Sequence, residues 1–193
     1  MIDKDKIEKA FNNYELLNEL EYKKSVNDTI NLLDMGELRV VYKEGDEWHV
    51  NEWVKKAVIL YFVLRKSEPV ELGIFNYNDK VKLKKNYDKL GVRVVPGAIA
   101  RYGSYLSKGV ILMPSFVNIG AYVGNNTMID TWATVGSCAY IGDNVHIAGG
   151  VGIGGVLEPP QARPVIIEDN CFIGSRSIIV EGVRVCREAV IGA

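Results

Sequence analysis

Isoleucine or valine occupies every sixth position over a long stretch of the chain. The series runs through Ile111, Val117, Val123, Ile129, Val135, Ile141, Ile147 and Ile153, and it resumes at Ile167, Ile173, Ile179, Val185 and Ile191. A period of six fits neither an α-helix, which repeats near 3.6 residues, nor a plain β-strand, which repeats at about 2. It is typical of a hexapeptide β-helix, in which each repeat forms one short strand and one corner.

Glycine repeats with the same period. It directly follows the aliphatic residue at Gly124, Gly136, Gly142, Gly154, Gly174 and Gly192. We expect each aliphatic side chain to point into the solenoid and the next residue to turn the chain. Glycine suits that turn because it lacks a Cβ atom.

The period is interrupted once. Fourteen residues separate Ile153 from Ile167, where twelve would keep the count, so we expect residues 154–164 to form an extruded loop. Irregular loops on a repeat scaffold are where function usually lies, because the regular coils build only the wall. The alternative is a solvent loop without a role.

Residues 1–95 lack the six-residue period and predict a separate α/β domain. Helical spacing of apolar residues from Ile7 to Leu17 indicates a first helix, and Ser25 with Asp28 resembles a capping box before a second helix that stops at Gly36. Residues 38–43 and 47–50 predict a hairpin, and 51–64 a buried helix. Residues 67–90 are expected to be a connector with little regular structure.

Composition narrows the function classes. The 193 residues contain 23 Lys and Arg against 24 Asp and Glu, a net charge of −1, which argues against a nucleic-acid-binding protein. The charged first six residues are followed by no apolar signal core, and the longest apolar run, 57–64, is too short to span a bilayer. A soluble, cytoplasmic protein is therefore expected.

The three cysteines show no metal-binding spacing. Cys138, Cys171 and Cys186 are odd in number and form no C-x-x-C pair, so reduced thiols are favoured over disulfides or a zinc site. We expect small buried apolar residues, with a redox or catalytic thiol as the alternative. The chain stops just after Ile191 opens a new hexapeptide, and a solenoid needs a cap, so we expect the C-terminal coils and the cap to be missing.

Several continuous stretches resemble the tetrahydrodipicolinate N-succinyltransferase family. They are residues 38–40, 53–58, 91–96, 112–122, 128–139, 144–146, 149–159 and 167–174. The resemblance implies a left-handed parallel β-helix over 96–193, with three hexapeptides per coil, and a homotrimer with active sites between subunits. It also implies transfer of succinyl from succinyl-CoA, as co-substrate, to the amino group of tetrahydrodipicolinate in its L-2-amino-6-oxopimelate form, on the diaminopimelate route to lysine, without a metal or prosthetic group.

The same resemblance assigns site residues. Asp130, in the run M-I-D-T-W-A, matches the family's substrate-binding and catalytic aspartate, although by itself it reads as a corner residue. An attacking amine must lose a proton, which a carboxylate can take. Arg93 matches a family position for substrate contact, and Arg176 with Ser177 is a second candidate for a substrate with two carboxylates. Without the resemblance both arginines read as surface residues.

One departure from the family concerns a second acid. In the best-known family members, the residue after the run G-A-R-S is a glutamate proposed to assist catalysis. This chain has Ile178 at that position, and Glu181 matches a different family glutamate. His146 is an alternative base, because other hexapeptide acyltransferases use histidine; its side chain faces either a groove or only solvent. Trp132 either walls the acceptor pocket or packs at a subunit interface.

The sequence also argues against two other enzyme classes. A γ-type carbonic anhydrase needs three histidine ligands, and the chain has two histidines. A nucleotidyl-sugar enzyme needs a glycine-rich nucleotide loop before the solenoid, which 1–95 lacks. Two alternatives remain open: a related acyltransferase that uses acetyl-CoA on the same acceptor, and a non-catalytic β-helix scaffold for binding or oligomerisation.

Overall fold

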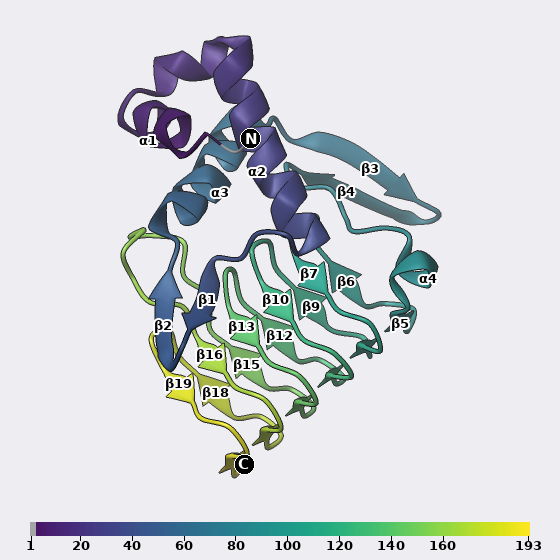
Figure 1. Ribbon diagram of the computed structural model, residues 1–193. Helices are drawn as coiled ribbons and strands as arrows, with labels where there is room; N and C mark the ends of the chain where they lie inside the picture. The colour runs from purple at the N-terminus through teal and green to yellow at the C-terminus, as the bar shows by residue number, and fades with distance from the viewer. Residues whose placement is uncertain (1–2) are drawn as a thin grey trace.

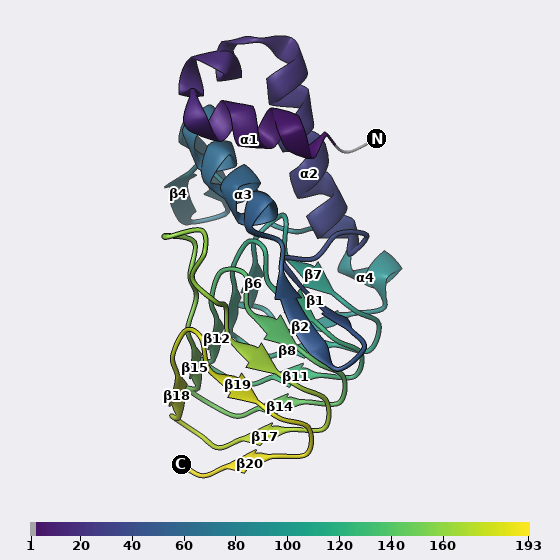
Figure 2. The same cartoon turned by 60° about the vertical axis from the view of Figure 1, so that its left-hand side comes forward.

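The computed structural model describes residues 3–193 as a helical N-terminal region packed beside a parallel β-helix (Figures 1 and 2). The N-terminal elements are α1 (Lys4–Asn12), the 3-10 helix η1 (Tyr14–Asn18), α2 (Leu20–Met35), β1 (Val41–Glu44), β2 (Glu47–Val50), α3 (Glu52–Leu64), β3 (Glu68–Leu72), β4 (Phe75–Asp79) and α4 (Tyr87–Leu90). β1 pairs with β2 and β3 with β4 in antiparallel hairpins. The β3–β4 hairpin projects away from the coils (Figure 1).

The structure confirms part of the N-terminal prediction and corrects the rest. Gly36 ends α2 with a φ of 75°, the 38–50 hairpin forms as β1–β2, and α3 covers the predicted buried helix. The first helix is broken, because Asn13 is extended and its side chain accepts a hydrogen bond from the Glu15 amide at the start of η1. The capping box at Ser25 is wrong, since α2 begins at Leu20.

The predicted unstructured connector is also wrong. Residues 67–90 contain the β3–β4 hairpin and α4. The sequence signal for the hairpin is weak because both strands mix polar and apolar residues, and β4 is exposed over most of its length. Gly73, at the turn, has a φ of 61°, which glycine adopts without strain.

The β-helix is a three-sided prism of two-residue strands. The six-stranded face holds β5 (Arg93–Val94), β8 (Ile111–Leu112), β11 (Met128–Ile129), β14 (His146–Ile147), β17 (Phe172–Ile173) and β20 (Val190–Ile191). A second face lies against the β1–β2 hairpin and is called the hairpin face. It holds β7 (Tyr105–Leu106), β10 (Tyr122–Val123), β13 (Tyr140–Ile141), β16 (Ile166–Ile167) and β19 (Arg184–Val185). The third face holds β6 (Ile99–Ala100), β9 (Phe116–Val117), β12 (Thr134–Val135), β15 (Gly152–Ile153) and β18 (Ile178–Ile179).

Strand pairing confirms the hexapeptide prediction. Strands on each face are parallel, and in the central coils paired residues such as Met128 and His146 stand three hexapeptides apart, which is one full coil. The predicted fold class, an α/β N-terminal region followed by a left-handed parallel β-helix, is confirmed. One member of the predicted series of inward aliphatic residues is wrong. Ile111 pairs with Met128, one residue short of three hexapeptides, so Leu112 is the fully buried residue and Ile111 faces outward.

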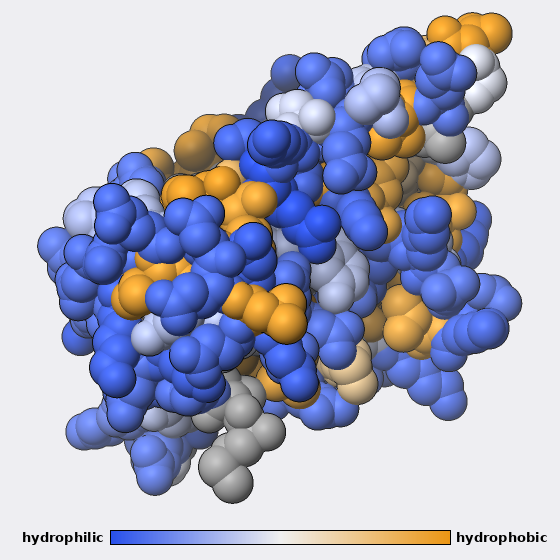
Figure 3. Space-filling model, turned by 90° about the horizontal axis from the view of Figure 1, so that it is seen from above, coloured by the Kyte–Doolittle hydropathy of each residue, from blue (hydrophilic) through white to orange (hydrophobic). Residues whose placement is uncertain are grey.

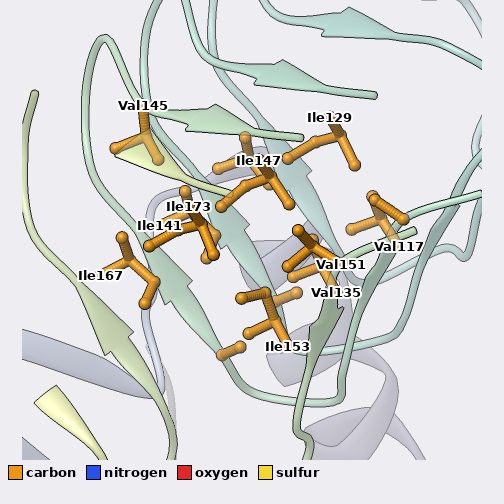
Figure 4. Close-up of a cluster of buried hydrophobic side chains, with 14 of the residues drawn as sticks. Val117, Ile129, Val135, Ile141, Val145, Ile147, Val151, Ile153, Ile167 and Ile173 are labelled. Carbon is orange, nitrogen blue, oxygen red and sulfur yellow. The ribbon is translucent and has the colours of Figure 1, made fainter. Parts of the chain in front are cut away.

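The inward aliphatic residues form a continuous core along the prism axis (Figure 4). Ile129, Ile141 and Ile147 have no exposed surface. Full burial of such a side chain contributes about 1.5–3 kcal/mol relative to an exposed one. The six-residue period therefore exists because each hexapeptide supplies one large side chain to this core.

Glycine occupies the predicted corner position for a different reason from the one expected. The left-handed turn residue stands two positions later, as at Asn144 with a φ of 55°. Gly142 itself needs to lack a Cβ because that atom would lie 2.7 Å from the backbone nitrogen of Asp169 in the next coil. Close stacking of consecutive coils, and not the turn, selects glycine there.

The β1–β2 hairpin covers the hairpin face of the prism. Outward tyrosines of this face stack on one another, with the Tyr122 and Tyr140 ring centroids 5.1 Å apart. The Arg39 guanidinium lies 4.0 Å from the Tyr122 ring centroid, and Trp48 packs edge-on against Tyr140. The Trp48 indole also donates a 2.8 Å hydrogen bond to Glu168. These contacts hold the N-terminal region against one face of the solenoid.

The predicted loop is confirmed, and its length is revised. Tyr122 pairs with Tyr140 across three hexapeptides, whereas Tyr140 pairs with Ile166 across three hexapeptides and eight further residues. The insertion lies at a single corner. The Lys55 ammonium, on α3, donates hydrogen bonds to the carbonyl oxygens of Pro159 and Ala162, at 3.3 and 2.7 Å. The loop thus packs against α3.

The surface seen from above in Figure 3 is mainly hydrophilic, with hydrophobic residues in separate small patches. Among residues 3–193, no helix has the length and the apolar character needed to cross a membrane.

Candidate functional site

The predicted site residues lie on the six-stranded face and on its corner with the third face. β11 ends at Ile129, and Asp130 is the first residue of the corner that follows. The same corner of later coils carries Gly149 and Gly150, and then Arg176. Successive corners are joined by backbone hydrogen bonds, from Gly150 to Thr131 at 2.8 Å and from Arg176 to Gly149 at 3.0 Å.

The Asp130 carboxylate is held on one side only. Its Oδ1 accepts hydrogen bonds from the backbone amide of Thr131 at 2.6 Å and from the Thr131 hydroxyl at 3.2 Å. The side chain is 33% exposed, so part of it is accessible from outside the prism, and Thr131 donates no hydrogen bond to Oδ2. Charge-assisted hydrogen bonds of this kind fix a carboxylate in one orientation.

His146 lies beside Asp130. Parallel pairing places His146 of β14 next to Met128 of β11, with its side chain on the outer surface. Its Nε2 atom is 3.7 Å from Oδ2 of Asp130. The imidazole also packs against Phe172 of β17, with ring centroids 5.2 Å apart. The two residues that the sequence presented as competing bases are therefore neighbours in one site.

The two predicted arginines flank Asp130 along the prism axis. Arg93 is two strands from Met128 through Ile111, and Arg176 is two coils from Asp130 in the opposite direction. With strands spaced by about 4.8 Å, each arginine backbone lies about 10 Å from the coil of Asp130. Both side chains are exposed. The structure thus brings Asp130 and His146 together and leaves the arginines further away.

Trp132 and Arg176 occupy the same corner position in different coils. Both adopt the left-handed conformation, with φ of 61° and 64°, which is uncommon for residues other than glycine. Trp132 is 77% exposed, although tryptophan is a large apolar side chain. Gly150 stands between them, and a Cβ there would lie 3.3 Å from Cγ of Arg176. The arginine side chain therefore crosses the space that Gly150 leaves open.

Ser177 and Ile178 make contacts with neighbouring coils and not with Asp130. The Ser177 hydroxyl donates a 2.7 Å hydrogen bond to the carbonyl oxygen of Gly192 in the next coil, which links two coils. Ile178 is 67% exposed on the third face, and its side chain lies over Gly152. Glu181, also exposed, stands at the corner after β18.

Sequence reasoning missed Thr131, Phe172 and Lys55. Thr131 lies in the run M-I-D-T-W-A, but nothing in the sequence shows that it binds the Asp130 carboxylate. The hexapeptide count does contain a signal that His146 lies near Asp130, because His146 stands three hexapeptides after Met128. The same count does not predict that Phe172 is the next neighbour, because the insertion loop lies between His146 and Phe172. Lys55 carries no signal, because its partners are backbone carbonyls.

The cysteine prediction holds for two of the three thiols. Cys138 and Cys171 are buried, whereas Cys186 is exposed, which corrects the expectation that all three are buried. Burial raises the pKa of Cys138 to about 12, so this thiol stays protonated near neutral pH. The Cys171 thiol donates to the backbone carbonyl of Cys186 at 3.1 Å.

Two clefts on the described surface lie away from Asp130. One, of about 490 Å³, is lined by Arg39, Tyr42 and Tyr140 beside the β1–β2 hairpin. Another, of about 400 Å³, is lined by Trp48 and Arg184 among others. Neither is lined by Asp130 or His146. Among residues 3–193, no three or more His, Cys, Asp or Glu side chains are grouped to hold a metal ion.

Three protein families match separate parts of the chain. Residues 4–64 match the family described as tetrahydrodipicolinate N-succinyltransferase N-terminal. Residues 120–155 match bacterial transferase hexapeptide (six repeats), and residues 164–193 match hexapeptide repeat of succinyl-transferase.

Curated relatives match most of the chain. A protein of Acinetobacter baylyi named 2,3,4,5-tetrahydropyridine-2,6-dicarboxylate N-succinyltransferase is 58% identical over 177 residues, covering 89% of this chain and 65% of the relative. A protein of the same name from Bartonella bacilliformis is 53% identical over 198 residues, covering 96% of this chain and 70% of the relative. The chain spans about two thirds of the length of these relatives. Among solved structures, PerB from Caulobacter crescentus in complex with CoA and GDP-perosamine covers 52% of this chain, and this chain covers 48% of it, with a TM-score of 0.33 and 20% identity, too low to inform function.

Proposed function

The chain belongs to the tetrahydrodipicolinate N-succinyltransferase family, and on this premise we propose that it transfers succinyl from succinyl-CoA to tetrahydrodipicolinate, the 2,3,4,5-tetrahydropyridine-2,6-dicarboxylate of its relatives' names. The acceptor reacts in its ring-opened L-2-amino-6-oxopimelate form, on the diaminopimelate route to lysine. The observation that carries the proposal is 53% identity to a named relative over 96% of the chain, from the helical region through the coils around Asp130.

The chemistry requires one proton acceptor. The acceptor's amine is mostly protonated near neutral pH and must be neutral to attack. In the proposed reaction the ammonium first gives one proton to solvent, and the neutral amine nitrogen bonds to the thioester carbonyl carbon. One N–H proton of that nitrogen passes to Oδ2 of Asp130 as the carbon–sulfur bond breaks. The released CoA thiolate then takes this proton from Asp130, which regenerates the carboxylate. Oδ2 suits this role because Thr131 occupies the other oxygen. No metal or prosthetic group takes part in the proposal.

The arginines are proposed to bind the two carboxylates of the acceptor. A guanidinium can bind a carboxylate through two parallel hydrogen bonds. Arg93 and Arg176 are exposed and stand on opposite sides of the coil of Asp130. Ser177, next to Arg176, is assigned to the same substrate site, although its hydroxyl is hydrogen-bonded to Gly192 in this structure.

We also propose a cytoplasmic homotrimer with the site between subunits. Support comes from the open surroundings of Asp130 and from Trp132, which is 77% exposed beside it. Light scattering should give three times the subunit mass. In mixtures of inactive Arg93→Ala and Asp130→Asn subunits, recovered activity would show that one site draws on two chains; no recovery in mixed trimers would contradict a shared site.

Steady-state transfer by the full-length protein tests the function itself. Asp130→Asn is nearly isosteric and removes the base, so turnover should fall by roughly 10²-fold or more while the trimer persists. Turnover within a few-fold of the unmodified protein would make Asp130 only a corner residue. Activity with acetyl-CoA in place of succinyl-CoA would favour the related acyltransferase, and no binding of either would favour a scaffold.

A further inference from the structure

The Asp130 carboxylate is fixed through one oxygen and faces His146 with the other. Oδ1 is occupied by the amide and hydroxyl of Thr131, at 2.6 and 3.2 Å. Oδ2 lies 3.7 Å from Nε2 of His146. Each carboxylate oxygen has two lone pairs, so Oδ2 can accept one hydrogen bond from a protein donor and still receive a proton from a substrate.

The imidazole is held in place by the β-helix itself. His146 occupies the outward position of β14, between Met128 of β11 and Phe172 of β17 in the same row. The Phe172 ring, 5.2 Å from the imidazole by centroids, limits its rotation on one side. A separation of 3.7 Å exceeds a hydrogen bond, so the proposed contact requires the two side chains to approach when the acceptor binds. Catalytic hydrogen bonds are often long without substrate and shorten in the complex.

We propose that His146 is a positioning residue for Asp130 and not a second, independent base. Its Nε2–H donates to one lone pair of Oδ2 when the acceptor is bound and directs the other lone pair toward the amine. The amine proton passes to Oδ2, and His146 keeps its own proton throughout. The proposal rests on the proposed function, because it assumes that Asp130 takes the proton in amine acylation.

A double-mutant cycle separates action through Asp130 from independent action. His146→Phe preserves an aromatic ring beside Phe172 and removes the donor. It should lower kcat by about 10-fold to 100-fold, as expected for the loss of a hydrogen bond to a charged group, with little change in KM. In the Asp130→Asn background the same change should cost less than about two-fold, since residues that act as a unit are not additive.

A matched variant separates the donor from the fold. Gln places an amide N–H close to the position of Nε2, so His146→Gln should recover most of the kcat that His146→Phe loses. Both variants should keep the unfolding midpoint and oligomeric state of the unmodified protein. Equal losses of kcat in both variants would assign His146 a packing role and overturn the proposal. The same factor lost with and without Asp130 would also overturn it.

A spectroscopic measurement tests the contact even if the reaction is different. The chain has two histidines, His49 and His146, so ¹⁵N-labelled imidazoles are assigned by comparison with His49→Gln. Neutral His146 should be the Nε2–H tautomer in the unmodified protein and a mixture in Asp130→Asn. Retention of one tautomer without the carboxylate, or the Nδ1–H tautomer with it, would overturn the contact. A confirmed tautomer without succinyl transfer would refute the proposed function alone.

Discussion

The third face presents an isoleucine beside the site corner. Ile178, two residues after Arg176, is 67% exposed and lies over Gly152. In the best-known family members, a glutamate proposed to assist catalysis occupies the matching position. A carboxylate at so exposed a position would be well solvated, and its interaction with charges elsewhere in the site would be screened. The residue that performs proton transfer is therefore expected to be Asp130, whose orientation Thr131 fixes.

Restoring the acid should change little. We expect Ile178→Glu to leave kcat of the full-length protein within a few-fold, because in the proposed reaction Asp130 supplies the base without it. Ile178→Gln is the matched control, since it has the same shape without the charge. A gain in kcat of about ten-fold or more for Glu but not for Gln would mean that the reaction needs a second carboxylate.

At the scale of elements, two buried lysines join separate segments in different ways. Lys55 of α3 binds two carbonyl oxygens of the insertion loop, and no ion pair joins it to a carboxylate within residues 3–193. Lys84 binds the Asp34 carboxylate at 2.7 Å and the Asp34 carbonyl at 3.0 Å. Burial lowers the pKa of both lysines. The first holds a loop, and the second holds the end of α2.

Methionine at each position should separate these roles. Lys84→Met leaves the Asp34 carboxylate without its cation, at 20% exposure, and should lower the free energy of unfolding by about 3 kcal/mol. Lys55→Met leaves no buried charge, so its cost should be smaller, but hydrogen exchange should rise in residues 154–164. Urea unfolding and hydrogen exchange measure the two effects. A larger cost for Lys55→Met would contradict this account.

The β1–β2 hairpin is held to the prism by Glu168. Burial alone would raise the pKa of this carboxyl, but hydrogen bonds from the Trp48 indole, the Arg187 amide and the Arg184 guanidinium together lower its pKa. The folded protein therefore binds this proton less tightly than the unfolded chain. The resulting stability is present above the ordinary glutamate pKa of about 4.3 and is lost as pH falls through the lowered value.

Glu168→Gln tests this contribution. At neutral pH the variant should lose about 1–3 kcal/mol of unfolding free energy, since it weakens charge-assisted hydrogen bonds in a nearly buried site. The difference from the unmodified protein should shrink as the pH falls below about 4. Urea titrations at neutral and acidic pH measure it, with exposed Glu47→Gln on the same hairpin as control. A difference that does not depend on pH would rule out the ionised carboxylate as its source.

At the scale of the whole molecule, the aliphatic core runs through all three faces. Ile147 is fully buried, whereas Val190, on the same six-stranded face, is 73% exposed. Ile147→Ala should cost about 2–5 kcal/mol of unfolding free energy because it leaves a cavity in the central coils. Val190→Ala should stay within about 0.5 kcal/mol. Similar costs for both, measured by denaturant unfolding, would contradict the inward and outward assignment.

The repeat and its inward-facing core can be read from the sequence alone. A large residue at every sixth position is a local requirement that each hexapeptide meets separately, so the inward residues from Val117 to Ile153 are readable without coordinates. The positions of the corners can be read from the repeating glycines in the same way. Close stacking of coils, and not the turn, is the reason that glycine is needed at Gly142. Asp130 was found through resemblance.

The pairs of residues that meet across coils cannot be read from the sequence and depend on the folded structure. Which residues are neighbours on a face depends on the length of every corner between them. The corner near Pro114 is one residue shorter than the regular corners, so Leu112 is the inward residue. The coil between His146 and Phe172 contains the insertion loop, so these two residues pair although they are more than three hexapeptides apart. The same stacking places His146 beside Asp130. Contacts between coils are set by a hydrogen-bond register that spans a whole coil with all its corners and insertions, and no local pattern records that total length.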